Sequence, residues 1–177
     1  MNSSVAIDIS APADLVFRLA RDVERWPQLL PHYVRAKRLR TEQDGKLVVE
    51  FVARRPLIGP IGLAIPVAWR SRTWSEPATL GLRFQHLGGA TAGMDVTWHI
   101  VPTLAGCHVE IEHRFRRLVP LPAIGPLLGP EILPAFVDRF FTRPIASRTL
   151  ATFKAIAEAL AADDPQSAGP IPTNTKT

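Results

Sequence analysis

Hydrophobic and polar residues alternate along the middle of the chain. From Tyr33 to about residue 117 the alternation has a period of two, which is typical of strands that bury one face. The links between the alternating runs are short, so we expect consecutive strands to pair as an antiparallel meander. The pattern predicts a first strand with Val5, Ile7 and Ile9 inward, then strands over 33–42, 46–55, 66–76, 79–87, 92–102 and 106–117.

Three of the links carry turn signals. Gln43-Asp44-Gly45 is typical of a tight hairpin turn. Glu76-Pro77-Ala78 predicts a second turn, which places Leu80 inside the strand that follows. Leu87-Gly88-Gly89-Ala90 predicts a third.

Two short helices are expected after the first strand. Pro12 follows a small polar residue and Asp14 lies in the first turn, which together predict a helix start. This helix should end near Asp22. Trp26-Pro27 then begins a second helix, which Pro31 closes.

Near the C-terminus the apolar spacing becomes helical and predicts one long helix from 130 to 162. Pro144 lacks a backbone N–H, so we expect a kink near Phe140 and Phe141. The helix has one broad apolar face that needs a sheet to cover it. We therefore predict an α+β fold in which a curved, seven-stranded antiparallel sheet surrounds the C-terminal helix and leaves an internal cavity.

The domain organisation follows from the same pattern. Residues 1–162 form a single domain, whereas 163–177 are rich in polar residues and proline and predict a disordered tail. The start, MNSSVAIDIS, has neither the basic nor the apolar region of a signal peptide. No run of residues is long and apolar enough to span a bilayer, so a cytoplasmic protein is expected.

Charge and cysteine content narrow the function classes. The chain has 21 basic and 16 acidic residues, but the basic ones are scattered, so no nucleic-acid partner is expected. Cys107 is the only cysteine, which leaves no internal disulfide and no zinc site of the usual kind. His32, His99 and His108 lack carboxylates at ligand spacing, so we expect neither a metal nor another cofactor.

Two loops are unusually apolar. Residues 56–66 and 118–130 consist almost wholly of aliphatic residues, glycine and proline, whereas surface loops are normally polar. Arginine pairs precede both loops. The loops either form a hydrophobic mouth for a ligand, with peripheral contact to the inner face of a membrane, or pack on each other and cap the core.

The period of two also assigns side chains to the inward face of the sheet. His86 and His113 each fall on an otherwise apolar face, and Tyr33 is the only tyrosine. We interpret them as polar groups in a hydrophobic pocket, where they hold a ligand or move a proton. The alternative is that the histidines are satisfied within the core by neighbouring hydroxyl or carbonyl groups.

This order of elements resembles the helix-grip fold of the START-like (SRPBCC) superfamily. Residues 5–17, VAIDISAPADLVF, are similar to its opening strand and helix. Residues 22–33, DVERWPQLLPHY, are similar to the D-V-x-x-W-P-x-x-x-P segment of its polyketide cyclase/dehydrase branch, and coenzyme-Q-binding members carry a similar segment. The resemblance covers residues 3 to about 162 and implies a START-like domain, a fold that hosts carriers, receptors and enzymes alike.

Aromatase/cyclases of this family also carry a W-x-S-x-R pattern on a central strand. The corresponding positions here are Trp69, Ser71 and Thr73, so a threonine stands where the family has arginine. Arg70 and Arg72 have the opposite parity and should point outward.

The resemblance and the parity together give the candidate site. Trp26 and Tyr33 match pocket residues of the family by spacing, and Tyr33 and His113 are the candidate catalytic residues. The candidate ligand-binding residues are Trp26, Tyr33, Phe51, Trp69, Ser71, Thr73, Phe84, His86, Met94, Trp98, Ile111, His113, Phe136 and Phe140.

Three functions fit these features. The first is binding of a hydrophobic small molecule, such as a lipid, a quinone or other isoprenoid, or a polyketide-like compound, which enters past the two apolar loops. The second is a cyclase or dehydrase that acts through the polar groups of the cavity. The third is a protein-interaction module that uses the loops. The sequence leaves the oligomeric state open.

Overall fold

The computed structural model describes residues 1–56, 64–89, 91–115 and 132–163. Seven strands form one antiparallel sheet in the order β1-β7-β6-β5-β4-β3-β2. Strands β2 to β7 therefore pair with their sequence neighbours, as predicted, and β1 closes the far edge beside β7. The strands are β1 (Asn2–Ile9), β2 (Tyr33–Thr41), β3 (Leu47–Pro56), β4 (Ala64–Glu76), β5 (Gly81–Gly89), β6 (Met94–Thr103) and β7 (Gly106–Phe115).

The first two predicted turns are confirmed, although Leu80 lies outside the strand that follows the second, and the third predicted turn is wrong. Gly45 has a positive φ in the β2–β3 hairpin. The β4–β5 link is a single 3-10 turn, η2 (Pro77–Thr79), and Leu80 follows it in the left-handed region, outside the strand. Strand β5 runs on through Gly89, so the next turn lies at residues 91–93.

A bulge explains why β5 is longer than predicted. Ser71 pairs with His86 and Arg70 pairs with Gly88, so Leu87 is an extra residue opposite β4. Gly89 has a φ of 88°, and a Cβ atom at this position would overlap the β4 backbone at Ala68 and Trp69. The glycines of this segment thus serve close strand pairing rather than a turn.

The helical segments agree with the predicted order. Helix α1 (Ala13–Arg21) ends at Asp22, the 3-10 turn η1 (Val23–Arg25) follows, and α2 (Trp26–Leu29) ends before Pro31. Near the C-terminus residues 132–137 are helical, and α4 (Arg143–Ala162) completes the long helix. The segments predicted as a disordered tail and as two apolar loops lie outside the described residues, except for 56, 64–66 and 163.

An irregular turn interrupts the long helix where a kink was expected. Residues Asp138–Thr142 form a π-helical turn, in which the N–H of Arg143 bonds to the carbonyl of Asp138, five residues earlier. Pro144 has no N–H to offer to the carbonyl of Phe140, which disfavours regular α-helical bonding at this point. The extra residue of the π turn changes which side chains face the sheet.

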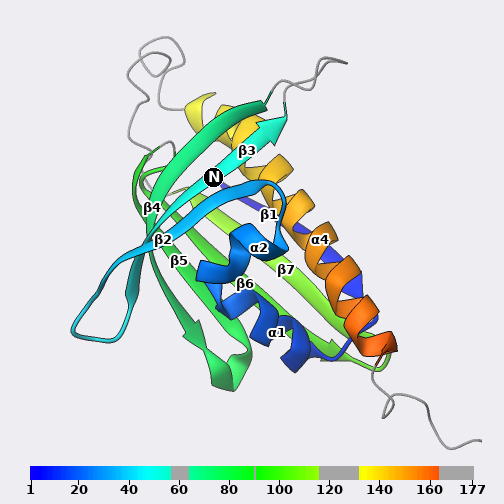
Figure 1. The fold of residues 1–177 in the computed structure, drawn as a ribbon. Coiled ribbons are helices and arrows are strands. Elements are labelled where there is room, and N and C mark those ends of the chain that lie inside the picture. Colours follow the sequence, from blue (N-terminus) through cyan, green and yellow to red (C-terminus); the bar gives the residue numbers. More distant parts are fainter. Residues whose placement is uncertain (57–63, 90, 116–131, 164–177) are drawn as a thin grey trace, which may run out of the picture.

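Among the described residues, the helices α1, α2 and α4 lie against one face of the sheet, with α4 running diagonally across it and α1 and α2 beside it (Figure 1). The inward residues of β4 to β7 are buried with period two, which confirms the predicted parity there, whereas β2 buries only Tyr33. Trp26, at the start of α2, lies at the centre of this layer, and its indole N–H donates to the carbonyl of Ala20 at 3.0 Å. The core therefore lies between the sheet and the helices, and the cavity lies within it.

Candidate functional site

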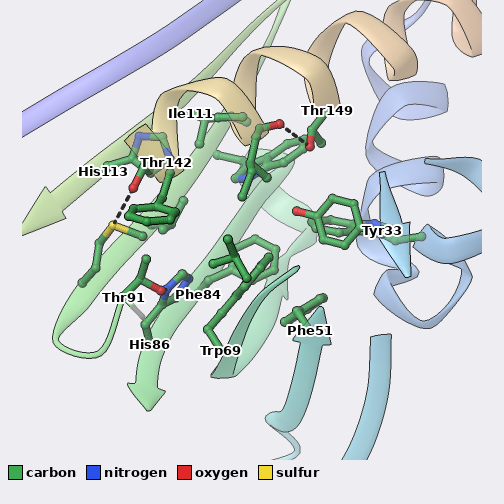
Figure 2. Close-up of a pocket in the computed structure, with 18 residues that line it drawn as sticks. Tyr33, Phe51, Trp69, Phe84, His86, Thr91, Ile111, His113, Thr142 and Thr149 are labelled. Carbon is green, nitrogen blue, oxygen red and sulfur yellow. Dashed lines mark hydrogen bonds between the residues drawn. The ribbon is translucent and has the colours of Figure 1, made fainter. Parts of the chain in front are cut away.

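A cavity lies between the concave face of the sheet and the N-terminal part of α4 (Figure 2). The space within it that is open to the centre of a water molecule has a volume of about 70 Å³. A single water needs ~10–15 Å³ by the same measure. The walls come from every strand except β1, and from α2 and the long helix.

Aromatic rings form most of the wall. Trp26 lies within 5.0–5.8 Å, between ring centroids, of four of them, which are Tyr33, Phe51, Phe84 and Trp98. Such edge-to-face and tilted contacts add to the burial of the rings. Aliphatic side chains from β4, β6, β7 and α4 complete the apolar lining, and none of the lining residues carries a formal charge at neutral pH.

One end of the cavity is polar because two histidines face it. His86 Nδ1 lies 2.5 Å from Thr91 Oγ1, and its ring stacks on Trp69. Burial, together with the nearby His113, lowers the pKa of His86 to about 3. His86 is therefore neutral at physiological pH.

His113 is the second histidine of this end. Its exposed fraction is 3%, and its Nδ1 has no hydrogen-bond partner within the described part of the chain. Burial lowers its pKa to about 4, although the nearby Asp138 opposes that effect. Ser3 Oγ donates to Asp138 Oδ1 at 2.5 Å, and Arg143 lies beside the other carboxylate oxygen at 3.3 Å, so β1 and the long helix fix the carboxylate.

The other end of the cavity is polar at Tyr33 and Thr149. Burial raises the pKa of the Tyr33 phenol well above its usual value, so the hydroxyl keeps its proton. Behind them His32 is 1% exposed, and its Nε2 lies 2.9 Å from Thr149 Oγ1. Burial, together with the charge of Arg148, lowers the pKa of His32 to about 4.

The structure brings most of the predicted ligand-binding residues to this cavity. Four do not border it: Ser71 and Thr73 are buried beside it, whereas Phe136 and Phe140 pack on each other outside it. Those that border it are Trp26, Tyr33, Phe51, Trp69, Phe84, His86, Met94, Trp98, Ile111 and His113. Their role in binding remains a prediction.

The π turn accounts for the position of Phe140, whereas Phe136 precedes the turn in the chain. It turns Phe141 and Thr142 toward the cavity, while Phe140 is 36% exposed. The Arg55 guanidinium lies 5.4 Å from the Phe140 ring centroid and 5.7 Å from that of Phe141. Phe140 and Phe141 thus make cation–π contacts with Arg55 at the start of the long helix, and Phe136 packs on both phenylalanines.

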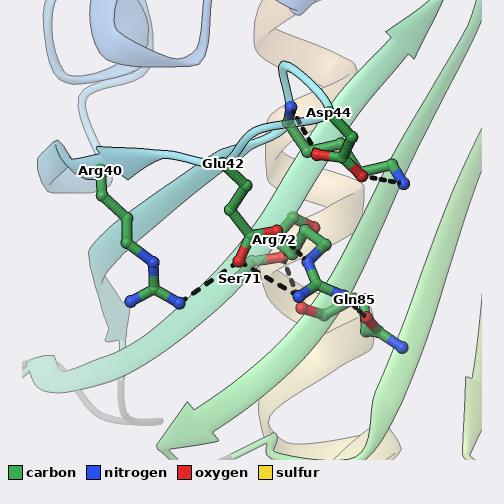
Figure 3. A network of polar contacts seen from close by, with 7 residues as sticks. Arg40, Glu42, Asp44, Ser71, Arg72 and Gln85 are labelled. Atoms are coloured by element: carbon green, nitrogen blue, oxygen red, sulfur yellow. Dashed lines mark hydrogen bonds and ion pairs between the residues drawn. The ribbon is translucent and has the colours of Figure 1, made fainter.

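The W-x-S-x-R region is not arranged as a polar site within the cavity. Ser71 Oγ is bonded to the backbone carbonyls of Arg72 and Gln85. Arg72 points to the outer face of the sheet, as its parity predicts, where its Nε donates to Glu42 Oε2 at 2.5 Å (Figure 3). The arginines of this strand therefore supply no charge to the cavity.

Sequence reasoning missed several residues that border the cavity. Thr149 lies on the apolar face of the predicted C-terminal helix but is not among the predicted site residues, and the sequence suggests only a test of His32 as a metal ligand. The strand predicted over 92–102 begins too early, because residues 91–93 form a turn in which Thr91 contacts His86. The other lining residues not predicted are Val67, Val96, Phe141, Thr142, Ile145 and Ala146.

Two further properties concern metals and membranes. Within the described ranges, no group of three or more His, Cys, Asp or Glu side chains is placed to hold a metal ion. Among the same residues, no helix is sufficiently long and apolar to cross a bilayer.

Solved structures share the fold. The Zhui aromatase/cyclase from a Streptomyces species is 20% identical, with a TM-score of 0.70 over 97% of this chain and 99% of the other. The di-domain aromatase/cyclase BexL is 24% identical, with a TM-score of 0.64 over 93% of this chain and 48% of the other. A START superfamily protein from Mycobacterium smegmatis is 15% identical, with a TM-score of 0.61 over 90% of this chain and 98% of the other. At these identities the likeness concerns the fold alone.

The sequence itself gives the family. Residues 2–158 match the family model described as "Polyketide cyclase / dehydrase and lipid transport". The match spans all seven strands, both short helices and most of α4. The chain therefore belongs to the polyketide cyclase/dehydrase and lipid transport family, within the START-like fold.

Proposed function

We propose that the protein binds an uncharged, largely apolar small molecule in the cavity between the sheet and α4. The observation that carries this proposal is the lining, which combines aromatic walls with polar but neutral groups at two ends. A charged ligand would lose its hydration there without gaining an ion pair, which costs several kcal/mol. The family description, which includes lipid transport, supports the same class of ligand.

Within that class a lipid, a quinone or other isoprenoid, and a polyketide-like ring system all fit an apolar wall. The aromatic contacts favour a flat ring over a plain acyl chain, because rings stack on Trp69, Phe84 and Trp98. The cavity volume of about 70 Å³ suits a small ring system, and a larger ligand requires side chains such as Phe141 to move.

The second part of the proposal is that the ligand enters the cavity from a membrane surface. The ligand enters past residues 56–66 and 118–130, whose apolar sequences suit contact with the inner face of a membrane. Support within the described residues comes from Ile65, Ile132 and Phe140, which are 41%, 60% and 36% exposed. The same loops are the surface that a protein partner would use if the chain were an interaction module.

A second candidate function is catalysis of the cyclase or dehydrase type. The observation that favours it is the pair of neutral histidines at one cavity end, since a neutral imidazole can accept a proton from a ketone-activated carbon. His113 would act as the base, and Tyr33 would orient the chain of ketones. Against it, the family's arginine position is Thr73, which lies outside the cavity lining.

Native mass spectrometry of the purified protein, followed by denaturing extraction, tests the binding proposal. We expect a co-purifying apolar molecule. Long-chain or isoprenoid compounds would favour a carrier, and an aromatic polyketide would favour the enzyme. A protein that carries nothing and also binds none of the classes named above in solution would refute the proposal.

Tryptophan fluorescence offers the solution assay. Trp26, Trp69 and Trp98 border the cavity, whereas Trp74 lies on the outer face under Lys46. A Trp74→Phe background therefore reports on the cavity alone. In that background Ala146→Leu should fill the cavity and abolish quenching by a bound quinone, while Ala155→Leu on the exposed side of α4 should leave it unchanged.

A further inference from the structure

Arg55 is a buried arginine near the end of β3. It continues the inward face of the strand after Phe51 and Ala53, and its exposed fraction is 9%. Within the part of the chain that the structure describes, its Nε has no hydrogen-bond partner and its guanidinium forms no ion pair with a carboxylate. A positive charge is therefore buried at this position without an anion beside it.

The guanidinium rests on two aromatic rings. It lies 5.4 Å from the ring centroid of Phe140 and 5.7 Å from that of Phe141. Cation–π contacts offset part of the cost of burying a charge, but a buried cation without a counter-ion remains unfavourable. The rings also leave the N–H of Nε without an acceptor. The side chain is thus held in place while its hydrogen-bonding capacity stays unused.

Exposed apolar side chains lie beside this arginine. Ile65 is its register partner on β4 and is 41% exposed, and Phe140 is 36% exposed. Strand β3 ends and β4 begins beside the first turns of the long helix, which brings these groups to one edge of the molecule (Figure 1). A cation among exposed apolar side chains suits a membrane surface, where anionic phosphates lie above the acyl chains.

Phe141 connects this edge to the cavity. Its ring contacts Arg55 and also borders the cavity, whereas Arg55 itself does not belong to the cavity lining. An anionic group bound at Arg55 therefore lies next to the cavity without entering its uncharged wall.

We propose that Arg55 binds the phosphate of an anionic membrane lipid and thereby docks this edge of the protein on the bilayer. A guanidinium presents its N–H groups as a planar fork that fits two phosphate oxygens. Ile65 and Phe140 supply the apolar contact with the bilayer. The inference rests on the second part of the proposed function, entry of the ligand from a membrane, and adds the lipid class and the residue that recognises it.

Sedimentation with lipid vesicles tests the site. We expect the protein to bind vesicles made of equal parts of phosphatidylcholine and phosphatidylglycerol more tightly than vesicles of phosphatidylcholine alone. Arg55→Met should weaken binding to the mixed vesicles at least about fivefold, the effect of one basic residue at an anionic surface. Arg70→Met is the matched control, because it removes the same charge from a side chain that is 64% exposed on the outer face of β4. Its loss should stay below about twofold, since salt screens a charge that is far from the lipid.

Thermal unfolding separates lipid binding from a structural role. Met replaces the unpaired charge with an apolar side chain, so Arg55→Met should unfold at the wild-type temperature or above it. Arg55→Lys keeps the charge but loses the planar fork, and it should recover only part of the vesicle binding. A lower unfolding temperature for Arg55→Met, together with full vesicle binding by Arg55→Lys, would show that the arginine only holds the two rings.

The other outcomes are equally decisive. Equal losses in Arg55→Met and Arg70→Met would refute the site, because binding would then follow net charge alone. If inorganic phosphate raises the unfolding temperature of the wild type but not of Arg55→Met, and vesicles do not bind, the anion is a soluble one and the membrane lipid is refuted. Quenching of the cavity tryptophans by a quinone tests the proposed function separately, and Arg55→Met should leave it unchanged. Absence of quenching in the wild type would count against the proposed function and not against the lipid site.

Discussion

The imidazole of His86 lies almost parallel to the indole of Trp69, with ring centroids 5.9 Å apart and an interplanar angle of 20°. The two side chains come from neighbouring strands, where Trp69 pairs with Gly89 and His86 pairs with Ser71, so that the bulge at Leu87 lies between the two pairs. Stacking covers one face of the imidazole, and Thr91 Oγ1 forms a hydrogen bond with its Nδ1. The arrangement stabilises the neutral ring, and it makes the stability of the protein depend on pH.

Three buried histidines should weaken the fold in acid. The pKa values of His32, His86 and His113 fall from 6.5 to about 4, 3 and 4 in the folded protein. Between about pH 4 and 6.5 the unfolded chain therefore binds more protons than the folded one, and the free energy of unfolding rises with pH. The contribution of the neutral histidines to the free energy of unfolding is complete above about pH 6.5 and is lost as the pH falls toward 4.

Urea denaturation at pH 7.5 and pH 5 measures this effect. We expect a loss on the order of 1–2 kcal/mol for each buried histidine over this interval. His113→Gln should reduce the pH dependence, whereas His99→Gln, on the exposed outer face, should leave it intact. Equal stability of the wild type at the two pH values would contradict the prediction.

The glycine pair at the end of β5 offers a matched test of backbone geometry. Gly89→Ala should lower the free energy of unfolding by about 1–3 kcal/mol, because its positive φ and its closeness to β4 both exclude a Cβ atom. A Cβ atom at Gly88 meets nothing within 4 Å, so Gly88→Ala should have little effect. Chemical denaturation of the two variants provides the comparison, and similar losses in both would argue against the close strand contact.

Asp138 links β1 to the π turn of the long helix. Asp138→Ala removes the bonds to Ser3 and Arg143 and should destabilise the protein by about 1–3 kcal/mol. The control is Asp14→Ala, which breaks an exposed ion pair with Arg18 and should cost less than about 1 kcal/mol. Thermal unfolding followed by circular dichroism distinguishes them. If the Asp138 variant is as stable as the control, the buried link contributes nothing.

Arg72 and His113 should differ in their effect on ligand binding. Arg72→Ala changes the outer face of the sheet only and should leave the dissociation constant of a bound quinone or naphthol unchanged. His113→Phe removes a polar group from the cavity wall and should weaken binding of a carbonyl-bearing ligand about five- to tenfold. Fluorescence titration in the Trp74→Phe background measures both. Weakened binding in Arg72→Ala would place the arginine near the ligand.

Most of the fold could be predicted because period-two alternation depends on local geometry. Successive side chains of a strand point to opposite faces, so the inward positions of β3 to β7 follow once a strand is recognised. The errors lie at positions where the ends of a strand differ from those that the alternation of hydrophobic and polar residues indicates. Gly88-Gly89 looks like a turn in the sequence, but the close approach of β4 makes it part of a strand.

The candidate site was predicted less completely than the fold. Parity identifies buried residues, but it does not distinguish a residue that borders empty space from one that touches another side chain. Ser71 and Thr73 are buried as expected, yet neither of them borders the cavity. That distinction depends on how the helices pack across the sheet.

The family, the order of elements and the inward face of the sheet could be predicted from the sequence alone, because all three follow from short motifs and local periodicity. Which polar groups meet depends on the tertiary packing. His32 and Thr149 are 117 residues apart in the chain, and a π turn of five residues sets which face of the helix meets the cavity. Contacts of this kind depend on the packing of distant segments, which no local pattern records.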